Sequence, residues 1–420
     1  MSIFSNAQNI VINNSQFTDV TMSGPSGIDI LLERSIPDAA YNSSARHPPP
    51  TCFPGTREQC IEDIVHWATP TEGQNPPRIY WMKGPGGVGK SAVAQTCTEK
   101  VKALGGLGAG FFFSINGRDD HTRFFTSLAY QLSTEHSDYR DLIDRRIYYN
   151  KLLVSSTLAS QFEALIAGPL QELENAGKGI GRRAVFIDGL DECKDQDAQC
   201  EIIEIIAESV REHTTPFCWA FFSRPEPHIE ATFTTVDIAP LCRKTLLSIS
   251  RDTDSEIDLY LRNGFRAVLL RHNLSLPASW PSDKEIQILV NGAAGLFIFA
   301  VTVLRFIRHA IMSGGDPKEA LHTIIQSISG RHQILLANDD QRHPFAEMDS
   351  FYLLIMQRIP DEMLASAQLV LNHRGGIQSS LPTYLDSPKS GSGISATGFT
   401  QFCILKKLKM DPSLRIELAS

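Results

Sequence analysis

The stretch Gly84-Pro85-Gly86-Gly87-Val88-Gly89-Lys90-Ser91 has the pattern G-x-x-x-x-G-K-S of a phosphate-binding loop. Residues 78–82 before it are β-branched and aromatic enough for a buried strand, and residues 92–97 after it predict the start of a helix. The motif binds phosphate in this context of strand, glycine-rich turn and helix. We therefore expect a nucleoside diphosphate or triphosphate to bind here.

The residue types of this loop have physical reasons. Glycine lets successive backbone N–H groups turn toward a phosphate, where a side chain would block the approach. The N-terminus of the following helix adds about half an elementary positive charge at the same place. Lys90 is expected to reach the β- and γ-phosphates, and the Ser91 hydroxyl is expected to ligate Mg²⁺.

An acidic motif, Asp188-Gly189-Leu190-Asp191-Glu192, follows an apolar strand predicted over residues 184–187. Ligands bind at the carboxyl edge of open α/β sheets, so this strand would deliver a carboxylate beside the phosphate loop. We assign Asp188 to Mg²⁺, mostly through water, because this ion keeps much of its hydration. Asp191 and Glu192 are both candidates to orient or deprotonate an attacking water, and the sequence leaves the choice between them open.

An arginine follows a third predicted strand. Residues 217–222 are apolar and aromatic, and Arg224 comes directly after them in the stretch Ser223-Arg224-Pro225. At the same sheet edge its guanidinium would contact the γ-phosphate or stabilise the transferred charge, and a solvated arginine is the alternative. His228, a few residues later, is expected to be structural rather than catalytic.

Strands that alternate with helices predict a three-layer α/β/α fold of the P-loop NTPase class, with a parallel sheet between the helices. A further strand of this core is expected at 107–114, and helices are expected at 123–132 and 140–175. Another helix is expected to begin at a capping box of Thr56 and Gln59 and to end near Ala68. No strand is expected after Leu241. Capping boxes at residues 253–256 and 282–285 and the apolar run 295–311 predict an all-α helical lid there.

Composition limits the function classes. With 420 residues, of which 42% are hydrophobic, the chain has room for two or three domains with real cores. The net charge of −8 argues against nucleic acid as the main partner. Eight scattered cysteines without zinc spacing predict reduced thiols and a cytoplasmic location. Residues 1–7 do not resemble a signal peptide, and the longest apolar run, 293–304, is too short to span a bilayer.

The first residues of the chain have an unusual pattern. In residues 1–24, Ile10 and Ile12 share one strand face and Asn13-Asn14 favours a turn. This segment is either a frayed tail with a weak hairpin, or a segment that pairs with copies of itself or with a protein partner, as its uncharged, Asn-rich core allows. Residues 35–51 are rich in proline and turn formers and are expected to form a linker.

The phosphate loop, the Asp188–Glu192 motif and the stretch 222–227, in this order, resemble the NACHT family of STAND-class NTPases. The chain is most similar to NLR-like NACHT proteins of fungi, whose nucleotide domain is also described as nephrocystin-3-like. This resemblance covers residues 50–360 and implies a switch that holds ATP or ADP with Mg²⁺, with a helical lid and a winged-helix-like segment. The chain has Gly295-Leu296-Phe297 where related switches often carry Gly-x-Pro.

These observations predict five segments: a β-prone segment and linker (1–50), the NTPase core (51–245), the helical lid (246–335), a partial winged-helix-like segment (336–375) and a poorly ordered end (376–420). The leading hypothesis is a signalling switch that binds and slowly hydrolyses ATP. The alternative is a scaffold that keeps the nucleotide as a structural ligand. No repeated sensor array is found, and without an Asn-Lys-x-Asp motif or an acceptor site, a GTPase and a small-molecule kinase are weaker hypotheses.

Overall fold

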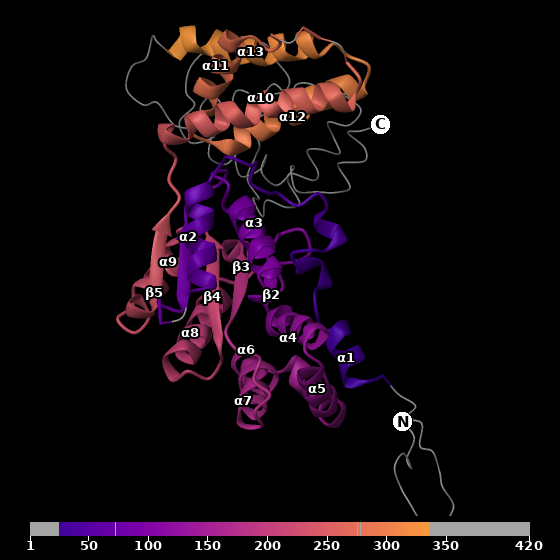
Figure 1. The fold of residues 1–420 in the computed structure, drawn as a ribbon, viewed down its shortest axis with the longest axis vertical. Coiled ribbons are helices and arrows are strands. Elements are labelled where there is room, and N and C mark those ends of the chain that lie inside the picture. The colour runs from indigo at the N-terminus through magenta and orange to yellow at the C-terminus, as the bar shows by residue number, and fades with distance from the viewer. Residues whose placement is uncertain (1–24, 72, 275, 278, 336–420) are drawn as a thin grey trace, which may run out of the picture.

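A parallel sheet forms the centre of the computed structural model, which describes residues 25–71, 73–274, 276–277 and 279–335 (Figure 1). The predictions for 1–24, 336–375 and 376–420 lie outside these residues. The strands are β1 (Ile79–Lys83), β2 (Leu107–Phe112), β3 (Arg183–Asp188), β4 (Phe217–Ser223) and β5 (Cys242–Leu246), in the spatial order β2-β3-β4-β1-β5. All neighbours are parallel, so the predicted α/β fold class is confirmed.

Strand β5 corrects the expectation that strands stop at Leu241. It pairs with β1 over its full length, and Ile79 lies opposite Cys242. Its Arg243, Lys244 and Leu246 are exposed, because this strand forms an edge of the sheet within the described residues. A half-exposed edge strand lacks the apolar run by which the other strands were recognised.

Helices cover both faces of the sheet. They are α1 (Gly27–Glu33), α2 (Glu58–Ala68), α3 (Lys90–Ala103), α4 (Phe124–Glu135), α5 (Ser137–Tyr149), α6 (Leu158–Gln161), α7 (Gly168–Asn175), α8 (Gln196–Glu212) and α9 (Pro227–Thr234). Successive residues of β1 point to opposite faces: Ile79 and Trp81 join the core under α4 to α9, whereas Tyr80 and Met82 join the core under α2 and α3.

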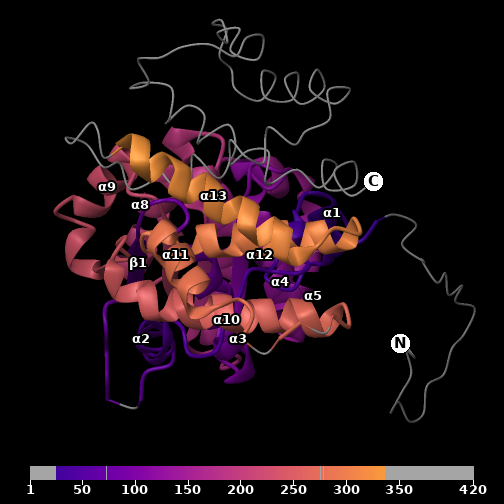
Figure 2. The ribbon, with the colours of Figure 1, turned by 90° about the horizontal axis from the view of Figure 1, so that it is seen from above.

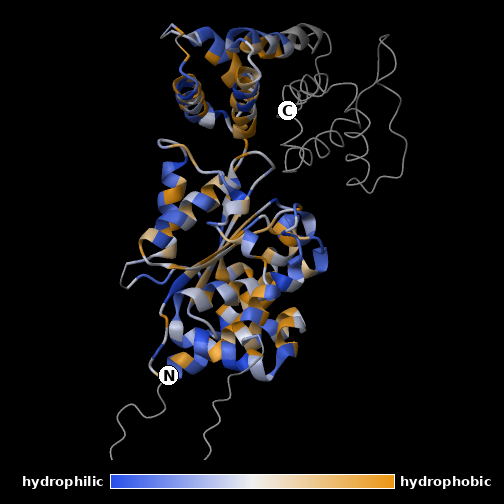
Figure 3. Cartoon of the chain, turned by 90° about the vertical axis from the view of Figure 1, so that its right-hand side faces the viewer, coloured by the Kyte–Doolittle hydropathy of each residue, from blue (hydrophilic) through white to orange (hydrophobic). Residues whose placement is uncertain are grey.

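The remaining helices are α10 (Asp254–Arg271), α11 (Asp283–Ala293), α12 (Phe297–Met312) and α13 (Pro317–Leu335), which we call the helical lid. In Figure 1 the lid lies above the sheet, with α4 to α8 toward the opposite end, and Figure 2 shows its helices from above. Apolar lid side chains such as Leu261 and Phe299 belong to the same buried cluster as Tyr80 of β1 and Val93 of α3. The hydropathy colouring of Figure 3 shows orange residues along the sheet and on the packed helices.

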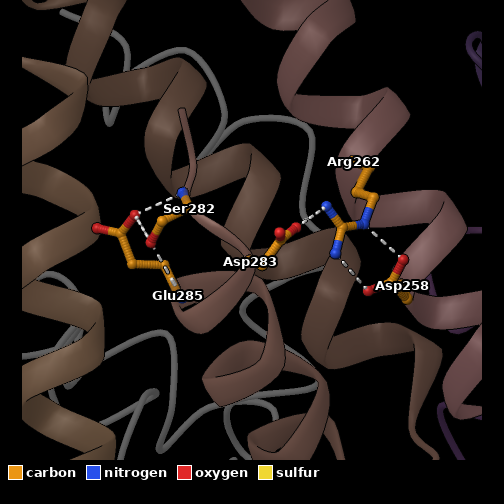
Figure 4. Close-up of polar contacts among 5 residues, drawn as sticks. All are labelled: Asp258, Arg262, Ser282, Asp283 and Glu285. Carbon is orange, nitrogen blue, oxygen red and sulfur yellow. Dashed lines mark hydrogen bonds and ion pairs between the residues drawn. The ribbon is translucent and has the colours of Figure 1, made fainter. Parts of the chain in front are cut away.

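One predicted capping box is present and two are not. Ser282 and Glu285 cap α11 reciprocally (Figure 4). Next to them Arg262 of α10 binds Asp283 of α11, and Asp258 on its own helix orients the guanidinium. The prediction was wrong for Thr56, whose hydroxyl donates to the Phe53 carbonyl while α2 begins only at Glu58.

The capping box predicted for Thr253 and Glu256 was also wrong. The Thr253 hydroxyl donates to the Ser250 carbonyl instead of capping α10. The Glu256 carboxylate accepts a hydrogen bond from the backbone N–H of Arg57, so a tertiary contact takes the acceptor that the cap required.

The helix expected over 140–175 is interrupted. Between α5 and α7 lie a 3-10 turn (Lys151–Ser155), α6 and a π-helical turn (Phe162–Ala167). Pro169 has no N–H to give the Leu165 carbonyl four residues earlier, and the buried Tyr139 hydroxyl donates to that carbonyl instead.

The stretch expected to be a linker contributes to the core in part. Ile36 and Ala39 are buried there, and the guanidinium of Arg46 lies 3.7 Å from the centre of the Phe112 ring. Proline and turn residues therefore mark an irregular segment here, but not a detached one. In the part of the chain that the structure describes, no helix is long and apolar enough to cross a membrane.

Candidate phosphate-binding site

The loop between β1 and α3 has the backbone that its glycines permit. Gly87 and Gly89 have φ values of 85° and 103°, in the left-handed region that side chains disfavour. At Gly84 a Cβ atom would lie 2.4 Å from the Leu247 carbonyl oxygen, so no side chain fits there. Helix α3 begins at Lys90, which directs the N-terminal end of the helix toward this loop.

Lys90 folds back over the loop. Its Nζ donates to the carbonyl oxygens of Gly84 at 2.6 Å and Pro85 at 2.9 Å. Burial lowers the pKa of the ammonium, while the carboxylates of Asp191 and Asp188 oppose this shift. The cation therefore lies within the electrostatic reach of both acidic residues.

Ser91 and Asp188 meet beside the loop. Asp188 is the last residue of β3 and is 6% exposed, and the Ser91 side chain is near enough to its carboxylate to lower the pKa of that group. Burial nevertheless raises the pKa of Asp188 to about 7. A hydroxyl and a carboxylate suit Mg²⁺, which takes few protein ligands and keeps water.

Asp191 interacts with Arg224 through both of its carboxylate oxygens. Its Oδ1 accepts a hydrogen bond from the Arg224 backbone N–H at 3.0 Å, and its Oδ2 lies 3.3 Å from the Arg224 Nε. The Asp191 side chain is 7% exposed, whereas that of Arg224 is 29% exposed. The pair fixes the guanidinium at the end of β4, which lies between β1 and β3. The sequence did not indicate this pairing.

Glu192 is held differently from Asp191. Its Oε2 is buried without a hydrogen-bond partner, and the neighbouring backbone of Ile115 lowers the pKa of the carboxylate. Burial, followed by the repulsion from Asp191, raises the pKa of Glu192 to about 7. One carboxylate oxygen therefore remains available for a ligand or a water molecule.

Two arginines beside this site were missed by the sequence reasoning. Arg118 donates from Nε to the Phe112 carbonyl, where β2 ends opposite Asp188. Burial lowers its pKa, and Glu192 is the first of the carboxylates that oppose this shift. Arg46 is the second, and burial lowers its pKa to about 10 against the attraction of Asp188. Neither arginine belongs to a motif, so no local pattern could have found them.

His228, expected to be structural, is hydrogen-bonded through Nε2 to Gln199 of α8 at 2.7 Å. This bond ties the start of α9 to α8, away from the contacts described above.

The helical lid contacts the phosphate loop directly. The backbone N–H of Ile298 donates to the Gly87 carbonyl at 3.1 Å, and Leu296 is buried. A Cβ atom on Gly87 would lie 2.5 Å from the Ile298 side chain. Thus the lid contacts the loop at Ile298, directly after the stretch Gly295-Leu296-Phe297.

A model of the nephrocystin 3 N-terminal family matches residues 55–224, from the turn before α2 to Arg224. No curated protein matches the sequence. Among solved structures, ORC1 of Aeropyrum pernix in complex with DNA has 15% identity, 86% of this chain and 84% of that chain covered, and a TM-score of 0.40. PCH-2 of C. elegans has 13% identity, 73% of each chain covered and a TM-score of 0.38. The Drosophila ORC bound to GC-rich DNA and Cdc6 has 11% identity, 82% of this chain and 54% of that chain covered, and a TM-score of 0.29.

Proposed function

We propose that this chain is a nucleotide-dependent switch of the P-loop NTPase class that binds ATP or ADP with Mg²⁺ and hydrolyses ATP slowly. One observation carries this proposal: Lys90, the Ser91–Asp188 pair and the Asp191–Arg224 pair gather at one sheet edge, beside a loop that the helical lid also contacts. A cation, a hydroxyl–carboxylate pair and a guanidinium are the parts that phosphoryl transfer requires.

The residues of the loop would bind the phosphates. Backbone N–H groups and the N-terminus of α3 supply partial positive charge, and Lys90 would exchange its two carbonyl contacts for phosphate oxygens. Ser91 and Asp188 would hold Mg²⁺, which neutralises charge on the β- and γ-phosphates when bound.

We assign the hydrolytic roles as follows. Glu192 would take the proton of the attacking water through Oε2, because this oxygen is buried without a partner. Asp191 would orient Arg224, whose guanidinium would stabilise charge on the transferred phosphoryl group.

The switch would operate between the core (51–245) and the lid (246–335). Moving a two-state equilibrium from 1:99 to 99:1 needs a difference in affinity of about 5.5 kcal/mol, to which contacts with the γ-phosphate would contribute. The order of the three motifs and the nephrocystin 3 match support our placing the chain with the NLR-like NACHT proteins of fungi. We also propose a cytoplasmic location, since the cysteines of the described residues are free thiols, and protein partners or self-association through residues 1–24.

The test is calorimetry with Mg-ATP and Mg-ADP on the variant Lys90→Ala. Loss of a charge-assisted contact to phosphate should weaken binding by about 10- to 100-fold. Lys100→Ala, an exposed lysine later on the same helix, is the matched control and should bind as the natural chain does. Unchanged affinity in Lys90→Ala contradicts the assigned site. A natural chain that ADP stabilises but that releases no phosphate from ATP would favour the scaffold.

A further inference from the structure

Arg57 lies where the NTPase core, the phosphate loop and the helical lid meet. Its side chain is 11% exposed, and its Nη2 donates to the Val88 carbonyl at 3.2 Å. On the lid side, its backbone N–H donates to Oε1 of Glu256 at 3.0 Å, and its Nε lies 3.6 Å from Oε2 of Glu256. Its guanidinium carbon lies 5.1 Å from the centre of the Phe297 ring. One side chain therefore contacts the loop, α10 and α12.

The backbone of this residue is strained in the same place. Arg57 has a φ of 57°, in the left-handed region that non-glycine residues rarely adopt. The preceding turn packs tightly on the lid: a Cβ atom on Gly55 would lie 2.8 Å from the Leu259 side chain, and the Phe53 ring contacts the Tyr260 ring edge-on. The surrounding contacts therefore hold Arg57 in this conformation, with its guanidinium directed at the loop.

The contact with Val88 matters because a peptide unit is planar. The carbonyl of one residue and the N–H of the next point in opposite directions, so fixing the Val88 carbonyl also fixes the N–H of Gly89. By the same reasoning, the bond from the Ile298 N–H to the Gly87 carbonyl fixes the N–H of Val88. Arg57 and Ile298 thus set the direction of two consecutive N–H groups of the phosphate loop.

The side chains of Arg57 and Glu256 form an ion pair without a hydrogen bond between them. Both Nε of Arg57 and Oε2 of Glu256 are buried without a hydrogen-bond partner, although they lie close to each other. Removing one charge would leave the other buried and unpaired, which is costly. The lid is therefore held to Arg57 by electrostatics as well as by the shared apolar cluster.

We propose that Arg57 is a positioning residue that couples the phosphate loop to the helical lid, so that release of Glu256 frees the Val88 carbonyl and loosens the loop and α12 together. The nucleotide-linked part of this inference rests on the proposed function. Because coupling is reciprocal, a ligand that reorients the loop would alter lid docking by the same free energy.

Hydrogen exchange of the full chain without nucleotide tests the coupling. Arg57→Gln should raise exchange by about tenfold both in residues 84–90 and around the Ile298 amide, because these segments open together. Arg262→Gln is the matched control: it breaks a lid arginine's pairs with Asp258 and Asp283 and should leave exchange of the phosphate loop unchanged.

Glu256→Gln keeps the acceptor for the Arg57 N–H and removes only the charge, so it should give the same two-segment pattern, even if Arg57→Gln does not fold. The double variant should exceed neither single variant, since both remove one coupling. Faster exchange in α10 alone, or additive effects, would overturn the proposal. The two proposals can fail separately. If exchange rises in both segments in these variants but Lys90→Ala binds nucleotide with unchanged affinity, the proposed function is rejected and the coupling by Arg57 is retained.

Discussion

Replacing Gly87 by alanine should separate backbone strain from the contact between loop and lid. A Cβ atom at this position would lie 2.5 Å from Cγ2 and 3.2 Å from Cβ of Ile298. The φ of 85° adds a cost of about 1–2 kcal/mol for any L-residue. Overpacking against Ile298 adds about 1–3 kcal/mol. We therefore expect Gly87→Ala to lower the free energy of unfolding by about 2–5 kcal/mol.

Gly89→Ala is the control for this prediction. Gly89 has a φ of 103°, but nothing lies within 4 Å of a Cβ atom there, so only the backbone cost remains. The assay is urea unfolding without nucleotide, followed by near-UV circular dichroism. In an Ile298→Ala background the difference between the two glycine variants should shrink to about 0.5 kcal/mol or less. Equal destabilisation by both variants, or a difference that survives in that background, would refute the reasoning.

Two further measurements concern buried polar groups. Burial raises the pKa of Glu192 from 4.5 to about 7, so the natural chain without nucleotide should lose stability relative to Glu192→Gln as the pH rises from 5 to 8. The contribution of Glu192 to stability is complete below the pKa that this residue has in the unfolded chain. It is lost as the pH rises through the pKa of about 7 that the residue has in the folded chain. The difference in unfolding free energy between the two chains should change by about 2–3 kcal/mol over this pH range. A difference that does not depend on pH would contradict the prediction. Tyr139→Phe should lower the free energy of unfolding by about 1–3 kcal/mol, because it leaves the Leu165 carbonyl without this donor. Tyr149, which is 78% exposed, is the control, and Tyr149→Phe should change the thermal melting curve little. Equal effects of the two substitutions would contradict this explanation.

The sequence was informative where chemistry is local. The glycines of the loop, Lys90 and Ser91 stand at a fixed spacing, and a strand and a helix flank them, so the motif and the α/β class followed without tertiary information. Parallel strands all end at one edge, so Asp188 and Arg224 were expected near the loop from their positions after apolar runs. The structure brings both of them there.

The sequence was uninformative where a partner lies far along the chain. Ser282 forms its capping box, whereas Thr253 does not, because Glu256 is bound by Arg57, 199 residues away. Asp191 and Glu192 are adjacent and chemically alike, and only the neighbouring strand distinguishes them, since Arg224 follows β4 and takes Asp191.

By itself, then, the sequence determined the phosphate loop, the strand ends that carry charge and the class of the fold, because each depends on residues a few positions apart. Tertiary structure alone decided that an exposed stretch becomes the edge strand β5, that Glu192 keeps a free oxygen, and that Arg57 joins the loop to the lid. These outcomes depend on burial and on charges from distant segments, which no local pattern of residues encodes.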